Sequence, residues 1–136
     1  MSGRIAIRQG DRSDIAKLHW IHARTSDLWV IASPLGNEVA RIESTDTGAQ
    51  LQRAGGQPES APDFRSLTER LLGVPIEPRQ LANWLHGTAG SITTGGWIVE
   101  VQETQKAGAV DIARLITARR GETSVRLVVD QYQARP

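Results

Sequence analysis

Residues 30–42 read VIASPLGNEVARI, in which two short apolar runs flank the turn SPLGN. Pro34 presets the φ angle that an early turn position needs, and Gly36 tolerates a positive φ without steric cost. The stretch therefore predicts a β-hairpin. Leu35 departs from the usual chemistry of such turns, because hairpin tips normally carry polar residues and this tip carries an apolar side chain.

Alternation of apolar and polar side chains continues on both sides of this hairpin. Such period-two alternation is typical of antiparallel strands with one buried face. Residues 27–32 are apolar on both faces, so we expect a central strand there, with either face turned inward. In total we predict about eight strands, over residues 3–9, 15–23, 27–32, 38–45, 49–54, 97–102, 111–118 and 123–133, with a weak additional strand around Ile92.

The period changes in the middle of the chain, where two short helices are expected. Asp63 is a plausible N-cap for the first helix, and Gly73 occupies the usual terminating position. Pro78 stands at or near the first position of the second helix, which is expected to stop at Gly87. Each helix has one apolar face, formed by Phe64, Leu67, Leu71 and Leu72 in the first and by Leu81, Trp84 and Leu85 in the second.

These elements predict a mainly β fold with two or three short helices. A long antiparallel sheet must curl to protect its edges, and short one-sided helices can cover one end of it or plug its hollow. The interior of such a sheet can be a filled core or can hold one small apolar ligand, and the pattern allows both. We predict a single domain over residues 1–136, because no repeat or linker interrupts the chain.

Composition argues against several classes of function. A net charge of +1 gives no electrostatic footprint for nucleic acid, and the chain contains no cysteine. His19 and His22 are three residues apart in a predicted strand, so they face opposite sides and cannot share a metal. No nucleophile elbow, phosphate loop, carboxylate pair or metal-ligand spacing is present. We therefore expect no enzyme activity, no catalytic residue, no metal and no cofactor.

The order of several motifs resembles the LolB family. These motifs are GRIAI at residues 3–7, KLHW at 17–20, LWVIASPLGNEVARI at 28–42, LTERLLGVPIEPRQLANWLHG at 67–87 and RLVVDQYQ at 126–133. The densest similarity lies in the turn containing PLG and in the paired-helix segment, where LLGVPI and LANWLHG are similar to the family's LTG-x-PIP and LRQWILG patterns. Each motif alone is weak, and their order and spacing make the resemblance specific.

The resemblance implies an open antiparallel β-barrel, or half-barrel, with a helical cap over a hydrophobic cavity. It implies a receptor that accepts lipoproteins from a LolA-like periplasmic carrier, binds their acyl chains and inserts them into the inner leaflet of the outer membrane. Family members act at the periplasmic face of that membrane, anchored through a lipidated N-terminal cysteine, which is not in this chain. The stretch after Gly87 is also shorter than in the family, so one side of the barrel is expected to be shorter.

The resemblance also suggests roles for individual residues. Leu35 matches the family's protruding leucine, which assists membrane contact. Without the resemblance, the simpler explanation is that Leu35 folds back onto the sheet or is one of the scattered exposed apolar residues that every protein has. For any single tryptophan, filling the core is the simpler explanation. We expect the acyl cavity to be lined by Leu18, Trp20, Val30, Leu67, Leu71, Leu81, Trp84, Leu85, Trp97, Val99, Leu127 and Val129.

Two other interpretations remain open at this stage. A soluble periplasmic carrier of the LolA type would share the cavity but would need neither a membrane-directed tip nor an anchor. A structural envelope module would have a packed core and would bind no acyl chain. A lipobox cysteine encoded upstream would separate the receptor from the carrier, and uptake of a fatty-acid probe would separate both from the structural module.

Overall fold

The computed structural model describes residues 1–86, 90–94 and 96–133. The chain divides into two compact units, and each is considered by itself below. Unit 1 comprises Met1–Ile15 and Ala82–Pro136, and unit 2 comprises Ala16–Leu81. In chain order the elements are β1 (Ser2–Gln9), β2 (Arg12–His22), β3 (Asp27–Ala32), β4 (Glu38–Thr45), β5 (Gly48–Arg53), β6 (Glu59–Ala61), α1 (Phe64–Leu72), α2 (Pro78–Leu85), β7 (Gly90–Thr94), β8 (Trp97–Ala107), β9 (Val110–Arg120) and β10 (Thr123–Gln131).

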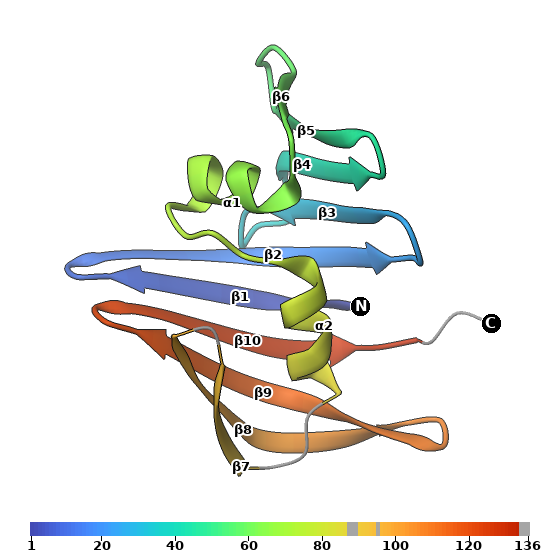
Figure 1. The fold of residues 1–136 in the computed structure, drawn as a ribbon, viewed down its shortest axis with the longest axis vertical. Coiled ribbons are helices and arrows are strands. Elements are labelled where there is room, and N and C mark those ends of the chain that lie inside the picture. Colours follow the sequence, from blue (N-terminus) through green and yellow to red (C-terminus); the bar gives the residue numbers. More distant parts are fainter. Residues whose placement is uncertain (87–89, 95, 134–136) are drawn as a thin grey trace. The chain divides into compact units, whose positions relative to one another are not determined.

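Unit 2 is an antiparallel array in the order β6-β5-β4-β3-β2 (Figure 1). Its register places Trp20 opposite Trp29, Trp29 opposite Ile42, and Ile42 opposite Leu51. All four side chains are buried, so they form one continuous apolar row across four strands. Residues directly opposite each other share a face of the sheet, and this row therefore defines the inner face of unit 2.

Helix α1 covers part of this inner face. It contacts β4, β5 and β6 (Figure 1), and Phe64 and Leu67 are buried. Both predicted helix ends are confirmed: Asp63 accepts a hydrogen bond from the Ser66 backbone N–H at 2.9 Å, and Gly73 ends the helix with a φ of 78°. The Ser66 hydroxyl also donates to Asp63, at 2.7 Å. These two hydrogen bonds lower the pKa of the Asp63 carboxyl below its ordinary value of 3.8.

A buried hydroxyl ties α1 to the segment that leads into α2. Thr68 is fully buried, and its Oγ1 donates to the Arg65 carbonyl at 2.9 Å and accepts the Ile76 backbone N–H at 2.8 Å. Val74 and Ile76 are buried as well, so this connection is part of the core rather than a surface loop. Helix α2 begins at Pro78, as the sequence predicts, while Gly87 lies outside the described residues.

Unit 1 is a second antiparallel array, in the order β1-β10-β9-β8-β7. Its register aligns Ile7 with Val125, Val125 with Ala118, and Ala118 with Val99, and all four side chains are buried. Gly3 lies at the start of β1, where a Cβ would come within 2.1 Å of the Val128 carbonyl oxygen. Only glycine allows that close approach of two strands.

The sequence-based expectation of a mainly antiparallel β fold with two helices is confirmed. The structure places ten strands in the residues it describes, against about eight predicted. The additional strands are β6, whose three residues are too few to show alternation, and β7, which lies where only a weak strand is expected. Both are edge strands of their arrays, so neither array closes on itself, and the helical cap over a cavity stays a prediction.

Candidate functional site

Leu35 lies at the tip of the turn between β3 and β4, and its side chain is 90% exposed. The turn is held by its own backbone, because Ser33 N–H donates to the Asn37 carbonyl and Gly36 N–H donates to the Ser33 carbonyl, both at 2.8 Å. The φ of Gly36 is 96°, the conformation for which the sequence needs glycine at this position. The alternative in which Leu35 folds back onto the sheet is therefore wrong.

Aromatic side chains concentrate on the inner face of unit 2. The ring of Trp29 meets that of Trp20 at a centroid distance of 6.4 Å and that of Phe64 at 5.1 Å, both in edge-on geometry. Trp29 and Leu67 are fully buried, and Leu18 is 2% exposed. This aromatic cluster (Trp20, Trp29 and Phe64) joins strands β2 and β3 to helix α1.

Trp20 is held in place by a polar contact at the end of the same hairpin. Its indole Nε1 donates to the Asp27 carboxylate at 2.9 Å, and His22 Nδ1 lies 2.5 Å from the same oxygen. An indole N–H can only donate a hydrogen bond, so when it is buried it needs an acceptor such as this carboxylate. Asp27 therefore fixes the orientation of Trp20 on the inner face.

Val30 is not on the inner face with Leu18 and Trp20, contrary to the sequence-based expectation. It is paired with His19 and Arg41, and it is only half-buried. Both faces of β3 are apolar, so alternation could not decide between them. The structure turns Trp29 and Ile31 inward instead, and sequence reasoning missed Trp29 for that reason.

The remaining predicted lining residues of unit 2 belong to the helices. Leu67 is buried, whereas Leu71 is half-buried near the C-terminus of α1. Leu81 is 1% exposed. Phe64, at the first position of α1, contacts the Trp29 ring and belongs to the apolar helix face that the sequence predicts.

Unit 1 has its own buried apolar face. The rings of Trp84 and Trp97 meet edge-on with centroids 5.9 Å apart, and the Arg120 guanidinium carbon lies 4.7 Å from the centre of the Trp97 ring. The contact between Trp84 and Trp97 joins the last turn of α2 to strand β8. The other predicted residues of this unit are all buried, namely Leu85, Val99, Leu127 and Val129.

Two indole N–H groups on these faces lack a hydrogen-bond partner. Within the described part of the chain, Trp29 Nε1 and Trp84 Nε1 are buried and unpaired. Each lies in a different unit. Leaving such a donor unpaired in a protein interior costs about 1–3 kcal/mol, so each of the two groups needs an explanation.

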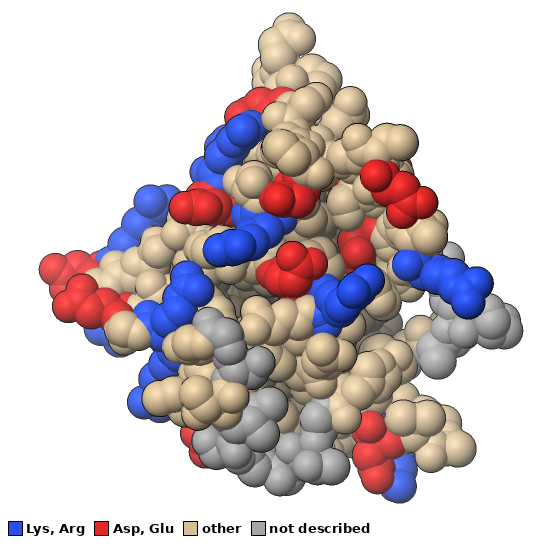
Figure 2. Space-filling model, in the orientation of Figure 1, with Lys and Arg blue, Asp and Glu red and all other residues tan. Residues whose placement is uncertain are grey.

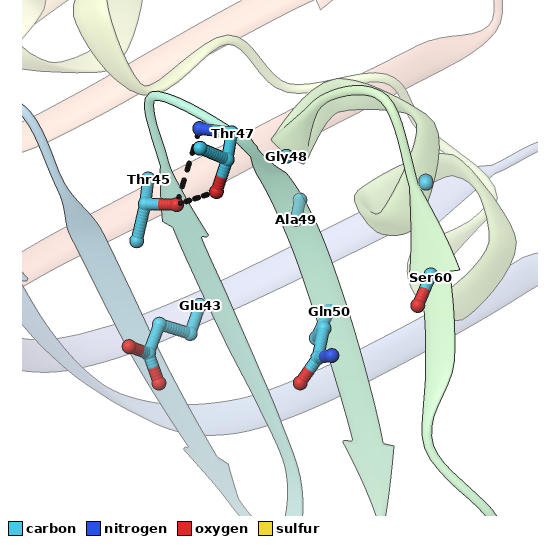
Figure 3. A pocket seen from close by; sticks show the side chains of 8 residues that line it. Glu43, Thr45, Thr47, Gly48, Ala49, Gln50 and Ser60 are labelled. Carbon is cyan, nitrogen blue, oxygen red and sulfur yellow. Dashed lines mark hydrogen bonds between the residues drawn. The ribbon is translucent and has the colours of Figure 1, made fainter.

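A different hollow, polar in character, lies on the outer face of unit 2. It is an open pocket of about 280 Å³ on strands β4, β5 and β6. Figure 3 shows Glu43, Gln50 and Ser60 side by side across these strands. At the adjoining turn, the hydroxyls of Thr45 and Thr47 are hydrogen-bonded to each other, with their oxygens 3.0 Å apart. The exposed polar lining of the pocket does not suit an acyl chain.

Charge and metal-binding groups add no further site. Figure 2 shows acidic and basic side chains interspersed over the visible face, in keeping with the net charge of +1. Among the residues that the structure describes, no group of three or more histidine, aspartate or glutamate side chains could hold a metal ion. None of the described helices is long and apolar enough to cross a membrane.

Comparison with known proteins assigns the family. The family model described as outer membrane lipoprotein LolB matches residues 1–132. The curated protein of Azoarcus sp. strain BH72, named outer-membrane lipoprotein LolB, is 26% identical over 98% of this chain and 77% of its own length. The protein of the same name from Dechloromonas aromatica strain RCB is 27% identical over 100% of this chain and 82% of its own length. The extent of the family match shows that this chain belongs to the LolB family.

Proposed function

We propose that this protein is a receptor for lipoproteins at the periplasmic face of the outer membrane. It accepts them from a LolA-like carrier by binding their acyl chains, and it inserts them into the inner leaflet of that membrane. In a LolB-family chain, the observation that carries this proposal is Leu35, whose apolar side chain is 90% exposed on a turn fixed by backbone hydrogen bonds.

Acyl-chain acceptance is proposed for the apolar inner faces. Aromatic rings cover part of each face, and the helices α1 and α2 contribute buried side chains. Each methylene that leaves water contributes about 0.8 kcal/mol, so a long acyl chain binds such a face strongly without any polar contact. The proposed lining keeps the predicted residues except Val30, which is replaced by Trp29.

Delivery to the membrane is proposed for Leu35. Burial of one leucine contributes about 1.5–3 kcal/mol, which is too little to hold a protein on a bilayer. Stable attachment generally needs a stronger anchor, such as a lipid chain, and a single apolar tip then orients the contact. We propose that Leu35 directs the protein's acyl load toward the lipid boundary while such an anchor holds it there.

The proposed transfer needs no chemical step. The acyl chains pass from the carrier to this protein and then to the bilayer, and each environment holds them more favourably than the one before. Because exchange between apolar environments can proceed downhill, no nucleotide or catalytic group is involved.

A transfer assay tests the proposal directly. A lipoprotein bound to a LolA-like carrier is mixed with the full chain, and the lipoprotein is expected to co-purify with this protein. Liposomes that are added afterwards are expected to take up the lipoprotein. Acceptance without delivery would favour a soluble carrier instead, and absence of acceptance at high protein concentration would favour a structural module with a packed core.

A further inference from the structure

Trp29 carries a buried hydrogen-bond donor that no described residue accepts. The side chain is fully buried, and its Nε1 has no partner among the described residues. An indole nitrogen can only donate, and buried polar groups in folded proteins are nearly always paired. An exception of this kind calls for a specific explanation, such as a ligand that supplies the acceptor.

Among the described residues, the identified neighbours of Trp29 offer no such acceptor. Its cross-strand neighbours are Trp20 and Ile42, and Phe64 contacts its ring from helix α1. A water molecule needs several polar partners to remain in a buried site, and these apolar neighbours do not provide them. The acceptor therefore has to arrive on a molecule that is itself largely apolar.

Trp20 shows that this fold can pair an indole when the role is structural. Its Nε1 donates to Asp27 at 2.9 Å, on the same face and in ring contact with Trp29. The two tryptophans thus differ in the pairing of their indole N–H groups: that of Trp20 is used within the protein, and that of Trp29 has no partner among the described residues.

We propose that the Trp29 indole N–H donates a hydrogen bond to the carbonyl oxygen of a bound acyl group. An ester or amide carbonyl is the one acceptor that an acyl chain carries, and it is joined directly to the alkyl chain that the apolar face would bind. This inference rests on the proposed function and adds to it a recognition element for acyl carbonyls. Since Trp29 is fully buried, the carbonyl reaches it only after neighbouring side chains move.

Trp84, in unit 1, also carries a buried indole N–H without a partner among the described residues. Its side chain is 5% exposed, its Nε1 is unpaired among the described residues, and its ring neighbour is Trp97. By the same reasoning it is a second donor to acyl carbonyls, and its variant tests that role independently.

The test compares two lipids that differ only in the carbonyl. A diester lipid and its diether analogue, with the same alkyl chains and headgroup, compete with a fluorescent fatty-acid probe for the full chain. The ether lacks the carbonyl oxygen and cannot accept this hydrogen bond in the same place. We expect the ester-to-ether preference to fall about tenfold in Trp29→Phe, which corresponds to ~1.4 kcal/mol at 25 °C. Trp84→Phe is expected to lower the preference similarly.

Tyr132→Phe is the control. It removes a hydrogen-bonding group from an aromatic side chain outside the proposed lining, where the hydroxyl is paired with His86 Nε2 at 3.2 Å, so the ester-to-ether ratio should stay at the wild-type value. Should Trp29→Phe fail to fold, replacement of Trp29 by benzothienylalanine removes the N–H while keeping the size of the ring.

The outcomes separate this inference from the function on which it rests. An unchanged ester-to-ether ratio in a folded protein that lacks the Trp29 N–H, whether Trp29→Phe or the benzothienylalanine variant, would overturn the hydrogen bond while leaving acyl binding intact. Failure of the wild-type chain to bind either lipid would overturn the proposed function itself.

Discussion

Substitution of Leu35 can change function without changing the stability of the fold. Because its side chain is 90% exposed, Leu35→Glu should change the free energy of unfolding by no more than about 0.5 kcal/mol. The charge should nevertheless impair delivery of lipoprotein to liposomes, since a carboxylate opposes entry into the acyl boundary. Acceptance from the carrier should remain. Thermal unfolding and the two stages of the transfer assay measure these effects separately.

Val110→Glu provides the control for this experiment. Val110 is also an exposed apolar residue beside a hairpin turn, with 48% of its side chain exposed, and no membrane role is proposed for it. The Val110→Glu substitution should leave both acceptance and delivery of the lipoprotein unchanged. Equal loss of delivery in the two variants would show that the effect of Leu35→Glu comes from added charge rather than from its position.

Helix α1 depends on a buried hydroxyl as well as on its caps. Thr68→Val keeps the shape of the side chain but leaves the Ile76 N–H without its acceptor, so we expect a loss of about 1–3 kcal/mol in the free energy of unfolding. Thr68→Ser retains the hydroxyl, so its free energy of unfolding should fall clearly less than that of Thr68→Val. Urea denaturation of both variants provides the measurement. Equal stability of the two would contradict a structural role for this hydrogen bond.

The N-cap of α1 has a pH dependence whose sign follows from its hydrogen bonds. Contacts with Ser66 lower the pKa of Asp63 in the folded protein, so its contribution to stability is present above the ordinary value of 3.8. That contribution is lost as the pH falls through the lowered pKa. At the near-neutral pH of a transfer assay the cap is therefore fully formed.

Acyl binding should be visible in the stability of the molecule as a whole. A ligand that binds only the folded state stabilises it by about 2.7 kcal/mol at a free concentration of 100 times its Kd. For a chain of 136 residues, such a gain raises Tm by several degrees. Thermal unfolding with and without a long-chain fatty acid tests this. A Tm that stays constant at saturating ligand concentrations would argue for a packed core.

The short-range features of this protein could be predicted from sequence. The turn at Leu35, the N-cap at Asp63 and the end of α1 at Gly73 each depend on the conformational preferences of a few adjacent residues. Strand positions were also predictable wherever one face was polar, because alternation then identifies the buried side. The family resemblance rested on the order of these same local motifs.

Features that depend on distant partners were decided only by the tertiary structure. Alternation could not orient β3, because both of its faces are apolar, and only pairing with β2 and β4 turns Trp29 inward and Val30 outward. The same applies to β6, which is a strand because β5 provides its hydrogen-bond partner. Whether an indole N–H is paired likewise depends on neighbours brought together by folding. Trp20 has Asp27 within reach and Trp29 has no acceptor in the described part of the chain, a difference that their positions in the sequence do not reveal.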